Sequence, residues 1–282
     1  MADSGRRPKG TFCGKLRYTF GKGRKLVGTN YDPRYWDSAA SFYTELGLPW
    51  QWLKDGYVPV VVELKKALGG LRGKRILDHG CGAGKIARLL KSVYGVEVCG
   101  IDPSENMICE ARKADPHGRY DLLAGDFPWP DSSLDGVMSN WVFVNIGTVE
   151  EMDTAAREIH RVLRPGGPFV MLVNNQEWVG RRTSTYQNGK LGQTYCPGDE
   201  IVVTYFKSED ECIEFKDYYW PTETYCSVAK RAGFKEVLSY VPELNPHTIG
   251  EIKFLQGVGV FPRVDCEALA GETPTVVIVA NK

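Results

Sequence analysis

The feature that most constrains the fold is an apolar run that leads into three glycines. Ile76 to Gly84 reads Ile-Leu-Asp-His-Gly-Cys-Gly-Ala-Gly, and a helix-like segment, 85–91, follows it. Alternate glycines allow a sharp turn at a strand end and bring backbone N–H groups close to a ligand, while the helix N-terminus adds a positive dipole. The segment predicts a strand, turn and helix that bind an adenine cofactor. A tight turn without a ligand is the alternative.

An acidic residue ends the next apolar segment, 96–102. This residue, Asp102, lies about 20 residues beyond the glycines, which suits an acid at the tip of the adjacent strand. An acid placed there can accept hydrogen bonds from both hydroxyls of a ribose. Asp102 could instead cap the following helix, for which Ser104 is equally suited. We favour the ribose interpretation because the glycine turn precedes it.

The spacing of the glycines distinguishes two classes of cofactor site. A dinucleotide fingerprint needs Gly-x-Gly-x-x-Gly, whereas the pattern from Asp78 is Asp-x-Gly-x-Gly-x-Gly. This pattern resembles motif I of the class I S-adenosylmethionine (SAM) methyltransferases, and the resemblance continues for roughly 200 residues. It implies that SAM is the cofactor, that S-adenosylhomocysteine is the product, and that no metal is required.

The resemblance also implies roles for individual residues. Those implied in cofactor binding are Asp78, Gly80, Gly82, Asp102, Met107, Asp126, Phe127 and Asn140. Met107 would lie against the adenine, the Asp126 carboxylate would accept from its exocyclic amine, and Phe127 would cover the ring. Asn140 would meet the methionine part of the cofactor after the fourth strand. A role for Met107 in the core of its helix is the alternative.

The order of the predicted elements indicates an α/β fold. Alternating strands and helices argue for a doubly wound, mainly parallel sheet, and the resemblance implies the Rossmann-like methyltransferase fold, whose seventh strand is antiparallel. We expect a basic N-terminal arm and helical lid in residues 1–70 and the SAM-binding domain in residues 71–282. A polar stretch after the fifth strand, about 174–220, is too long for an ordinary connection and predicts a substrate-covering insert. A hairpin over 200–216 and a helix over 222–231 complete this region.

Composition argues against several classes of protein. The 282 residues include 35 basic and 35 acidic side chains, so no net charge attracts nucleic acid or a membrane. The chain has no apolar run of about 18 residues and no signal-peptide pattern. Its 8 cysteines include no Cys-x-x-Cys pair, so we expect a cytoplasmic protein without disulfides or zinc. Eight Lys or Arg residues within 1–30 keep an RNA partner as a less favoured alternative, and a homodimer stays open.

The chemistry should occur beyond the carboxyl ends of the strands, where open parallel sheets bind their ligands. Glu177 would follow the fifth strand and His247 the sixth. A carboxylate that orients an imidazole fixes its tautomer and raises its basicity, so these two residues are candidates for a general base. A solvated histidine in a loop and a surface glutamate are the alternative.

Aromatic residues of the predicted lid, strand ends and insert suggest the class of substrate. The candidate substrate-binding residues are Tyr31, Tyr35, Trp36, Trp141 and Trp178. Such side chains suit a flat aromatic or cationic small molecule, although ordinary packing also explains many of them. The whole resembles small-molecule tailoring methyltransferases of secondary metabolism.

We therefore predict methylation of a small aromatic molecule, with an indole carbon as one candidate acceptor. The nitrogen or oxygen of a small amine or phenol is the alternative acceptor. Two alternatives come from other classes, an RNA methyltransferase and a SAM-binding protein without catalysis.

Overall fold

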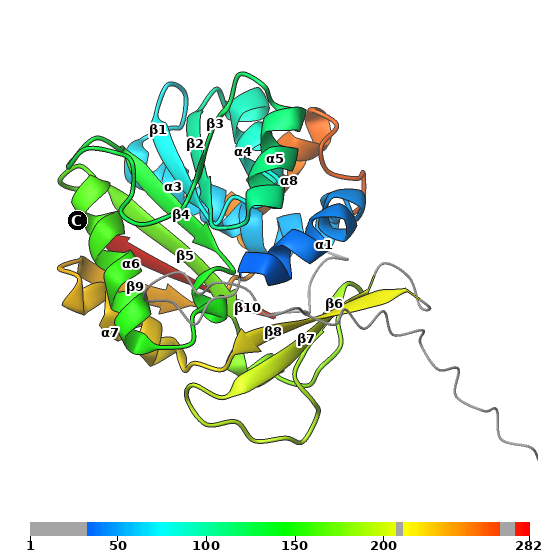
Figure 1. The fold of residues 1–282 in the computed structure, drawn as a ribbon. Coiled ribbons are helices and arrows are strands. Elements are labelled where there is room, and N and C mark those ends of the chain that lie inside the picture. Colours follow the sequence, from blue (N-terminus) through cyan, green and yellow to red (C-terminus); the bar gives the residue numbers. More distant parts are fainter. Residues whose placement is uncertain (1–32, 207–210, 266–273) are drawn as a thin grey trace, which may run out of the picture.

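The computed structural model describes residues 33–206, 211–265 and 274–282. Seven strands form its main sheet in the order β3-β2-β1-β4-β5-β10-β9 (Figure 1). These strands are β1 (Arg75–His79), β2 (Glu97–Asp102), β3 (Arg119–Leu122), β4 (Gly136–Asn140), β5 (Pro168–Asn174), β9 (Lys235–Tyr240) and β10 (Thr275–Asn281). The first five pair in parallel, whereas β10 is antiparallel to both β5 and β9. The predicted sheet, with its antiparallel seventh strand, is confirmed.

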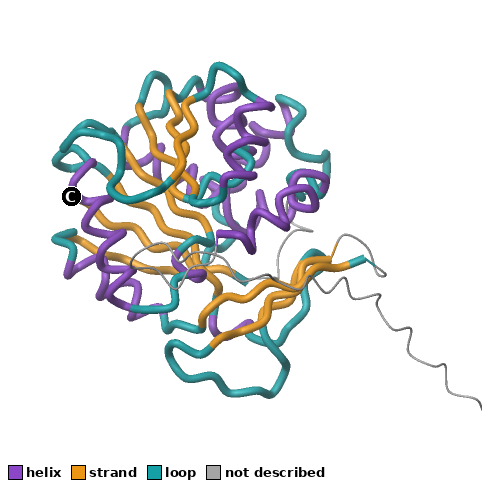
Figure 2. Tube along the Cα trace, in the orientation of Figure 1, coloured by secondary structure: helices purple, strands orange, loops and turns teal. Residues whose placement is uncertain are grey.

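Helices cover both faces of this sheet (Figure 2). The helices are α3 (Val58–Leu68), α4 (Lys85–Leu89), α5 (Glu105–Ala114), α6 (Val149–Val162), α7 (Thr222–Arg231) and α8 (Pro246–Gly257). Side chains of α6 and α7 pack with Leu77 in one core cluster, and those of α3, α4 and α8 pack with Ile76 in another. Neighbouring residues of β1 therefore point into opposite layers, as the period of two of a strand requires.

A helical segment precedes the sheet and lies against α5. It consists of α1 (Pro33–Glu45), α2 (Trp50–Trp52) and a π-helical turn, η1 (Leu53–Tyr57). Asp37 of α1 accepts hydrogen bonds from Ser104 Oγ at 2.5 Å and from the Asn106 N–H at 3.1 Å. Helix α3 is part of the main core, because its buried Leu64 packs with residues of the sheet. The proposed lid is therefore restricted to α1, α2 and η1. The basic arm, 1–30, lies outside the described residues.

The stretch between β5 and α7 forms a second, three-stranded sheet. Its strands are β6 (Tyr186–Asn188), β7 (Glu200–Phe206) and β8 (Cys212–Tyr218), all antiparallel. Strands β7 and β8 correspond to the predicted hairpin and α7 to the predicted helix, whereas β6 was not predicted. One face of this sheet packs against α1 (Figure 1). There the Trp36 ring stacks on Phe215 with centroids 4.7 Å apart.

Helix α8 occupies the place where the sequence suggested a loop around His247. Asn245 caps it, and its Oδ1 accepts from the His247 N–H at 3.0 Å. The helix also buries Glu251, which accepts from Lys65 Nζ at 2.6 Å. A charged residue on the buried side interrupts the apolar periodicity by which helices are recognised.

Candidate active site

The turn between β1 and α4 requires glycine. Gly80 and Gly84 have φ values of 74° and 70°, in the left-handed region that side chains with a Cβ rarely adopt. A Cβ at Gly80 would lie 2.1 Å from Val142, and one at Gly84 would lie 2.8 Å from Tyr120. Because Gly80 and Gly84 have no Cβ, the backbone of this turn can pass close to Val142 and Tyr120.

Asp102 ends β2 beside this turn. The Gly82 N–H donates to its Oδ2 at 2.8 Å, and the Ser104 N–H donates to its Oδ1 at 2.9 Å. Burial raises the pKa of Asp102 to about 6, although these two donors act in the opposite direction. The side chain that caps α5 is Ser104, whose Oγ accepts from the Met107 N–H at 3.1 Å. Each oxygen of Asp102 keeps a lone pair for a ligand.

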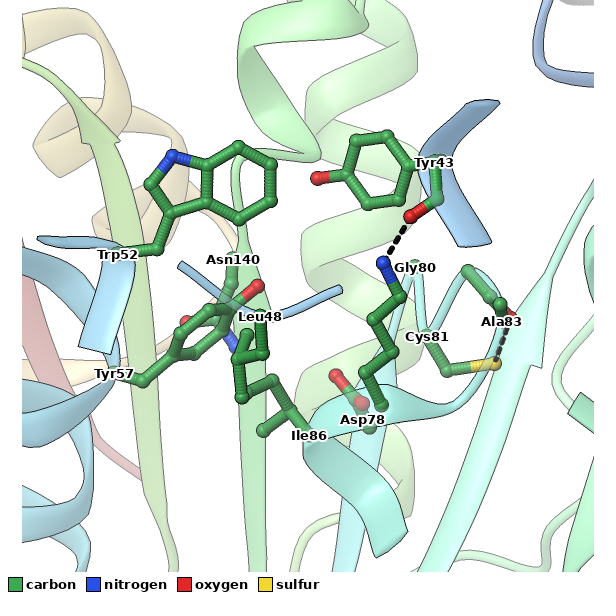
Figure 3. Close-up of a pocket in the computed structure, with 12 residues that line it drawn as sticks. Tyr43, Leu48, Trp52, Tyr57, Asp78, Gly80, Cys81, Ala83, Ile86 and Asn140 are labelled. Atoms are coloured by element: carbon green, nitrogen blue, oxygen red, sulfur yellow. Dashed lines mark hydrogen bonds between the residues drawn. The ribbon is translucent and has the colours of Figure 1, made fainter. Parts of the chain in front are cut away.

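A pocket lies beside the turn and is closed on one side by the proposed lid. The lid contributes aromatic side chains, and the turn contributes backbone and small residues (Figure 3). The lining residues are Tyr43, Leu48, Trp52, Tyr57, Asp78, Gly80, Cys81, Gly82, Ala83, Lys85, Ile86 and Asn140.

The Asn140 amide is the clearest sign of a ligand in this pocket. Its Oδ1 and Nδ2 atoms are both buried, and neither has a hydrogen-bond partner among the residues that the structure describes. Buried amides in native proteins are nearly always paired. An amide with an open donor and an open acceptor at the end of β4 therefore indicates that a polar ligand completes the site.

Asp78 adds a carboxyl group to the same pocket. It is only 3% exposed. Burial, and then the charge of Asp102, raises the pKa of Asp78 to about 8. This pKa favours the protonated carboxyl at neutral pH, and a bound cation would favour the ionised form.

The backbone is strained where it leaves β4. Trp141 has a φ of 55°, which is uncommon for a bulky residue and is found where the surrounding structure enforces it. A Cβ at Gly56 would lie 2.7 Å from the Trp141 ring, so η1 and the indole are in close contact. The same indole meets Tyr57 edge to face, with centroids 5.5 Å apart. Trp141 thus lies beside the pocket, against the lid.

An aromatic cluster connects the pocket to the insert. The rings of Trp52, Tyr43 and Tyr205 contact one another: the Trp52 centroid is 5.5 Å from that of Tyr43 and 5.6 Å from that of Tyr205, and the two tyrosine centroids are 6.2 Å apart. Its ring is also 6.3 Å from that of Trp141. The lid, the end of β4 and strand β7 therefore contribute to one continuous aromatic wall.

Comparisons with known proteins agree on one family. Residues 77–171 match the family described as Methyltransferase domain. N-demethylindolmycin N-methyltransferase from Streptomyces griseus is 32% identical over 196 residues, which are 66% of this chain and 81% of that protein. The chain belongs to the class I SAM-dependent methyltransferases.

A second relative is similar in sequence, and two solved structures are similar in fold. An O-methyltransferase from Aspergillus nomiae is 34% identical over 169 residues, 55% of this chain and 72% of that protein. A solved structure from Pyrococcus horikoshii OT3 superposes with a TM-score of 0.55 at 19% identity and covers 89% of this chain and 95% of that one. An S-adenosylmethionine-dependent methyltransferase from Clostridium acetobutylicum gives a TM-score of 0.53 at 13% identity, over 87% and 98% of the two chains.

SAM is therefore the cofactor of this methyltransferase, and the pocket fits it. SAM carries a sulfonium, an ammonium and a carboxylate. Aromatic rings such as Trp52 and Tyr57 favour a cation, ionised Asp78 would complement one, and the open amide of Asn140 offers a donor and an acceptor. The described ranges contain no group of three or more His, Cys, Asp or Glu side chains that could hold a metal ion. No helix within those ranges has the length and apolarity needed to cross a membrane.

The residues predicted to bind adenosine have different surroundings. Met107 is 2% exposed, and its sulfur lies 3.8 Å from the position of a Cβ at Gly82. Asp126 is exposed in the loop after β3. Phe127 is 6% exposed and packs in the core with His79, with ring centroids 5.5 Å apart. The roles of these residues beside the adenine stay predictions.

The structure does not bring the two candidate base residues together at the pocket. Glu177 is exposed in η4 (Gln176–Trp178), and His247 is exposed in the first turn of α8. Neither lines the pocket, and no hydrogen bond or ion pair between their side chains is found in the described part of the chain. A dyad of Glu177 and His247 stays a prediction that no contact supports.

The five candidate substrate-binding residues are distributed over three regions. Trp36 and Trp141 belong to the lid and to the end of β4, as predicted from the sequence. Trp178 is half-buried in η4 at the start of the insert. Tyr31 lies outside the described residues, and for Tyr35 the structure describes only the backbone, within α1. Their contacts with substrate stay predictions.

Tyr57 and Lys85 line the pocket but were not predicted from the sequence. Tyr57 ends the π-helical turn, so no single helical period connects it to the aromatic residues of α1. Lys85 directly follows the third glycine, and its Nζ donates to the Gly47 carbonyl at 2.6 Å and to the Tyr43 carbonyl. Burial lowers the pKa of Lys85 to about 8. Its ammonium group thus ties the C-terminal end of α1 to the glycine turn.

Proposed function

We propose that this protein transfers the methyl group of SAM to a nitrogen atom of a small aromatic molecule bound beneath α1 and the β6–β8 sheet. The observation that carries the proposal is the aromatic wall that runs from Tyr43 and Trp52 of the pocket to Tyr205 of the insert. Offset and edge-to-face packing on such rings favours a flat aromatic ligand.

The cofactor would bind across the carboxyl ends of β1, β2 and β4. In this arrangement the backbone at Gly80 and Gly82 approaches the SAM, and Asp102 accepts from the ribose hydroxyls. Met107, Asp126 and Phe127 would surround the adenine. Asp78 and Asn140 would meet the methionine end. Support comes from the fixed carboxylate of Asp102 and from the open amide of Asn140.

Catalysis in such a site depends chiefly on alignment. Methyl transfer from a sulfonium is an in-line displacement at an activated carbon, and holding the two reactants in line can contribute about 7 to 11 kcal/mol. Trp141, fixed by its contacts with Gly56 and Tyr57, would restrict the acceptor to one orientation. The aromatic rings would also exclude water from the reacting atoms.

Nitrogen is favoured as the acceptor over carbon and oxygen. The relative from Streptomyces griseus carries the name of an N-methyltransferase, and its match covers 66% of this chain. Methylation of an indole carbon is the second candidate. It would draw on a base that removes the ring N–H proton, such as the predicted pair of Glu177 and His247, but both side chains are exposed and away from the pocket lining.

The test is incubation of the protein with methyl-labelled SAM and a panel of indoles, aromatic amines and phenols, followed by mass spectrometry. We expect S-adenosylhomocysteine and a label on the nitrogen of at least one panel member. Labelling of ring carbon or of phenol oxygen alone would reject the nitrogen assignment. Binding of SAM without turnover of any panel member would instead favour a SAM-binding protein without catalysis.

A further inference from the structure

A buried carboxyl group, Asp217, lies on the inner face of the insert. Alternate residues of β8, namely Ile213, Phe215 and Asp217, are buried, and the residues between them are more exposed. The first two pack with Ala39 of α1 in an apolar cluster. Asp217 is only 5% exposed. A charged residue on an otherwise apolar face is costly and therefore calls for a specific explanation.

Two amide groups from the carboxyl edge of the main sheet hold this carboxyl. Asn145, in the short helix η3 (Phe143–Asn145) after β4, donates from Nδ2 to Oδ1 at 3.0 Å. Asn174, the last residue of β5, donates from Nδ2 to Oδ2 at 3.3 Å. Asp217 is thereby anchored across the strand ends where a methyltransferase binds its reactants.

No cation pairs with this carboxyl among residues 33–206, 211–265 and 274–282. Burial raises the pKa of Asp217 to about 8, with only the Asn174 hydrogen bond in opposition. A structural carboxylate would normally be paired, since an unpaired buried charge is expensive. A carboxyl whose pKa lies near the working pH is instead suited to exchange a proton.

The lid covers Asp217 through its partner Asn145. Trp36 Nε1 of α1 donates to Asn145 Oδ1 at 2.9 Å. Burial raises the pKa of Tyr43, which lines the SAM pocket, and of Tyr205 in the aromatic wall, and the charge of Asp217 adds to the rise in both. Asp217 therefore lies within electrostatic reach of both the cofactor pocket and the proposed substrate cavity.

We infer that Asp217 binds the N–H group of the acceptor and takes its proton during methyl transfer. This inference rests on the proposed function and names the acceptor as a small aromatic molecule with an N–H group. The nitrogen lone pair forms the new bond to the methyl carbon, and the carbon–sulfur bond breaks with its electron pair left on sulfur. The N–H proton passes to a carboxylate oxygen of Asp217, and solvent later receives it. The products are S-adenosylhomocysteine, the N-methylated acceptor and a released proton.

The reaction should then depend on ionised Asp217. The titratable groups that lie within reach of its charge are Tyr43 of α1, Tyr205 of β7 and Tyr225 of α7. Burial is the largest cause that raises the pKa of each phenol, and the charge of Asp217 adds to the rise. These phenols therefore stay neutral over the range in which Asp217 ionises. For the wild-type protein at a SAM concentration that saturates it at every pH, kcat/KM for the acceptor should rise with pH to a plateau, with an apparent pKa near 8. A flat profile between about pH 6 and pH 9 would overturn the inference.

The decisive variant is Asp217→Asn, which keeps the shape of the side chain and removes the proton acceptor. We expect kcat to fall roughly 100- to 10,000-fold, with the affinity for SAM, measured by calorimetry, unchanged. The matched control is Glu214→Gln, which neutralises an exposed carboxylate on the outer face of the same strand. It should keep wild-type turnover.

The outcomes separate the two proposals. If the wild-type protein methylates an N–H acceptor and Asp217→Asn does so equally well, the inference about Asp217 fails and the proposed function stands. If the wild-type protein binds SAM but methylates no nitrogen acceptor, the proposed function fails, and the inference with it. If Asp217→Asn also loses SAM binding, the pH profile of the wild-type protein tests the inference in its place. A rise of kcat/KM with an apparent pKa near 8 supports it, and a flat profile overturns it.

Discussion

At the scale of single residues, the site combines predicted and unpredicted carboxyl groups. Asp78 was identified through the resemblance of its segment to motif I, and Asp102 through its position at the end of the strand that follows the glycine turn. Asp217 was not, since its partners Asn145 and Asn174 are distant in sequence and meet it only after the insert has folded over the sheet. The sequence around Asp217 therefore does not show that its side chain is buried at the carboxyl ends of β4 and β5.

The raised pKa of Asp78 predicts that SAM affinity increases with pH. Below a pH of about 8 the Asp78 carboxyl is mainly protonated, and it must release its proton to complement a bound cation. Affinity should therefore weaken by up to roughly tenfold for each pH unit below that pKa. Calorimetry in two buffers of different ionisation enthalpy should detect the released proton.

The control for this prediction is Asp78→Asn. Lys85 also lines the pocket, and its pKa is lowered to about 8, so it titrates in the same range. The part of the pH dependence that disappears in Asp78→Asn belongs to Asp78. Equal slopes in the wild-type protein and the variant would show that Asp78 does not meet the cofactor's cation.

At the scale of elements, most of the fold could be predicted from the sequence. The helix expected over 222–231 coincides with α7, and the expected hairpin corresponds to β7 and β8. Helix α8 was missed because Glu251 interrupts its apolar periodicity, although Asn245 followed by Pro246 is a readable cap and first helical position. Strand β6 was missed because three residues carry too short a pattern.

The docking of α1 on α5 yields a prediction at this scale. Asp37 accepts from the Asn106 N–H, a donor in the first turn of α5 that has no partner within its own helix. Asp37→Ala should weaken the docking by about 1 kcal/mol, so amide hydrogen exchange in α1 should accelerate while exchange in the main sheet is unchanged. Ser41→Ala, an exposed change on the same helix, is the control. Equal exchange in both variants would mean that Asp37 does not hold the lid.

At the scale of the whole molecule, three separate parts of the chain enclose the site. The Rossmann-like sheet supplies the glycine turn, the lid supplies Tyr43 and Trp52, and the insert supplies Tyr205. The sequence predicted that a lid and an insert exist, because their length and composition differ from ordinary connections. It could not predict that Trp36 stacks on Phe215, since such a contact depends on how two inserted elements pack against each other.

The most direct test of this account is a crystal structure of the protein with S-adenosylhomocysteine. We expect the ribose hydroxyls at Asp102, the amino acid end at Asp78 and Asn140, and the sulfur facing the aromatic wall that contains Trp52 and Trp141. This arrangement would direct the methyl group of SAM toward the insert and Asp217. A cofactor whose sulfur faces away from that wall, or whose ribose does not contact Asp102, would contradict the account.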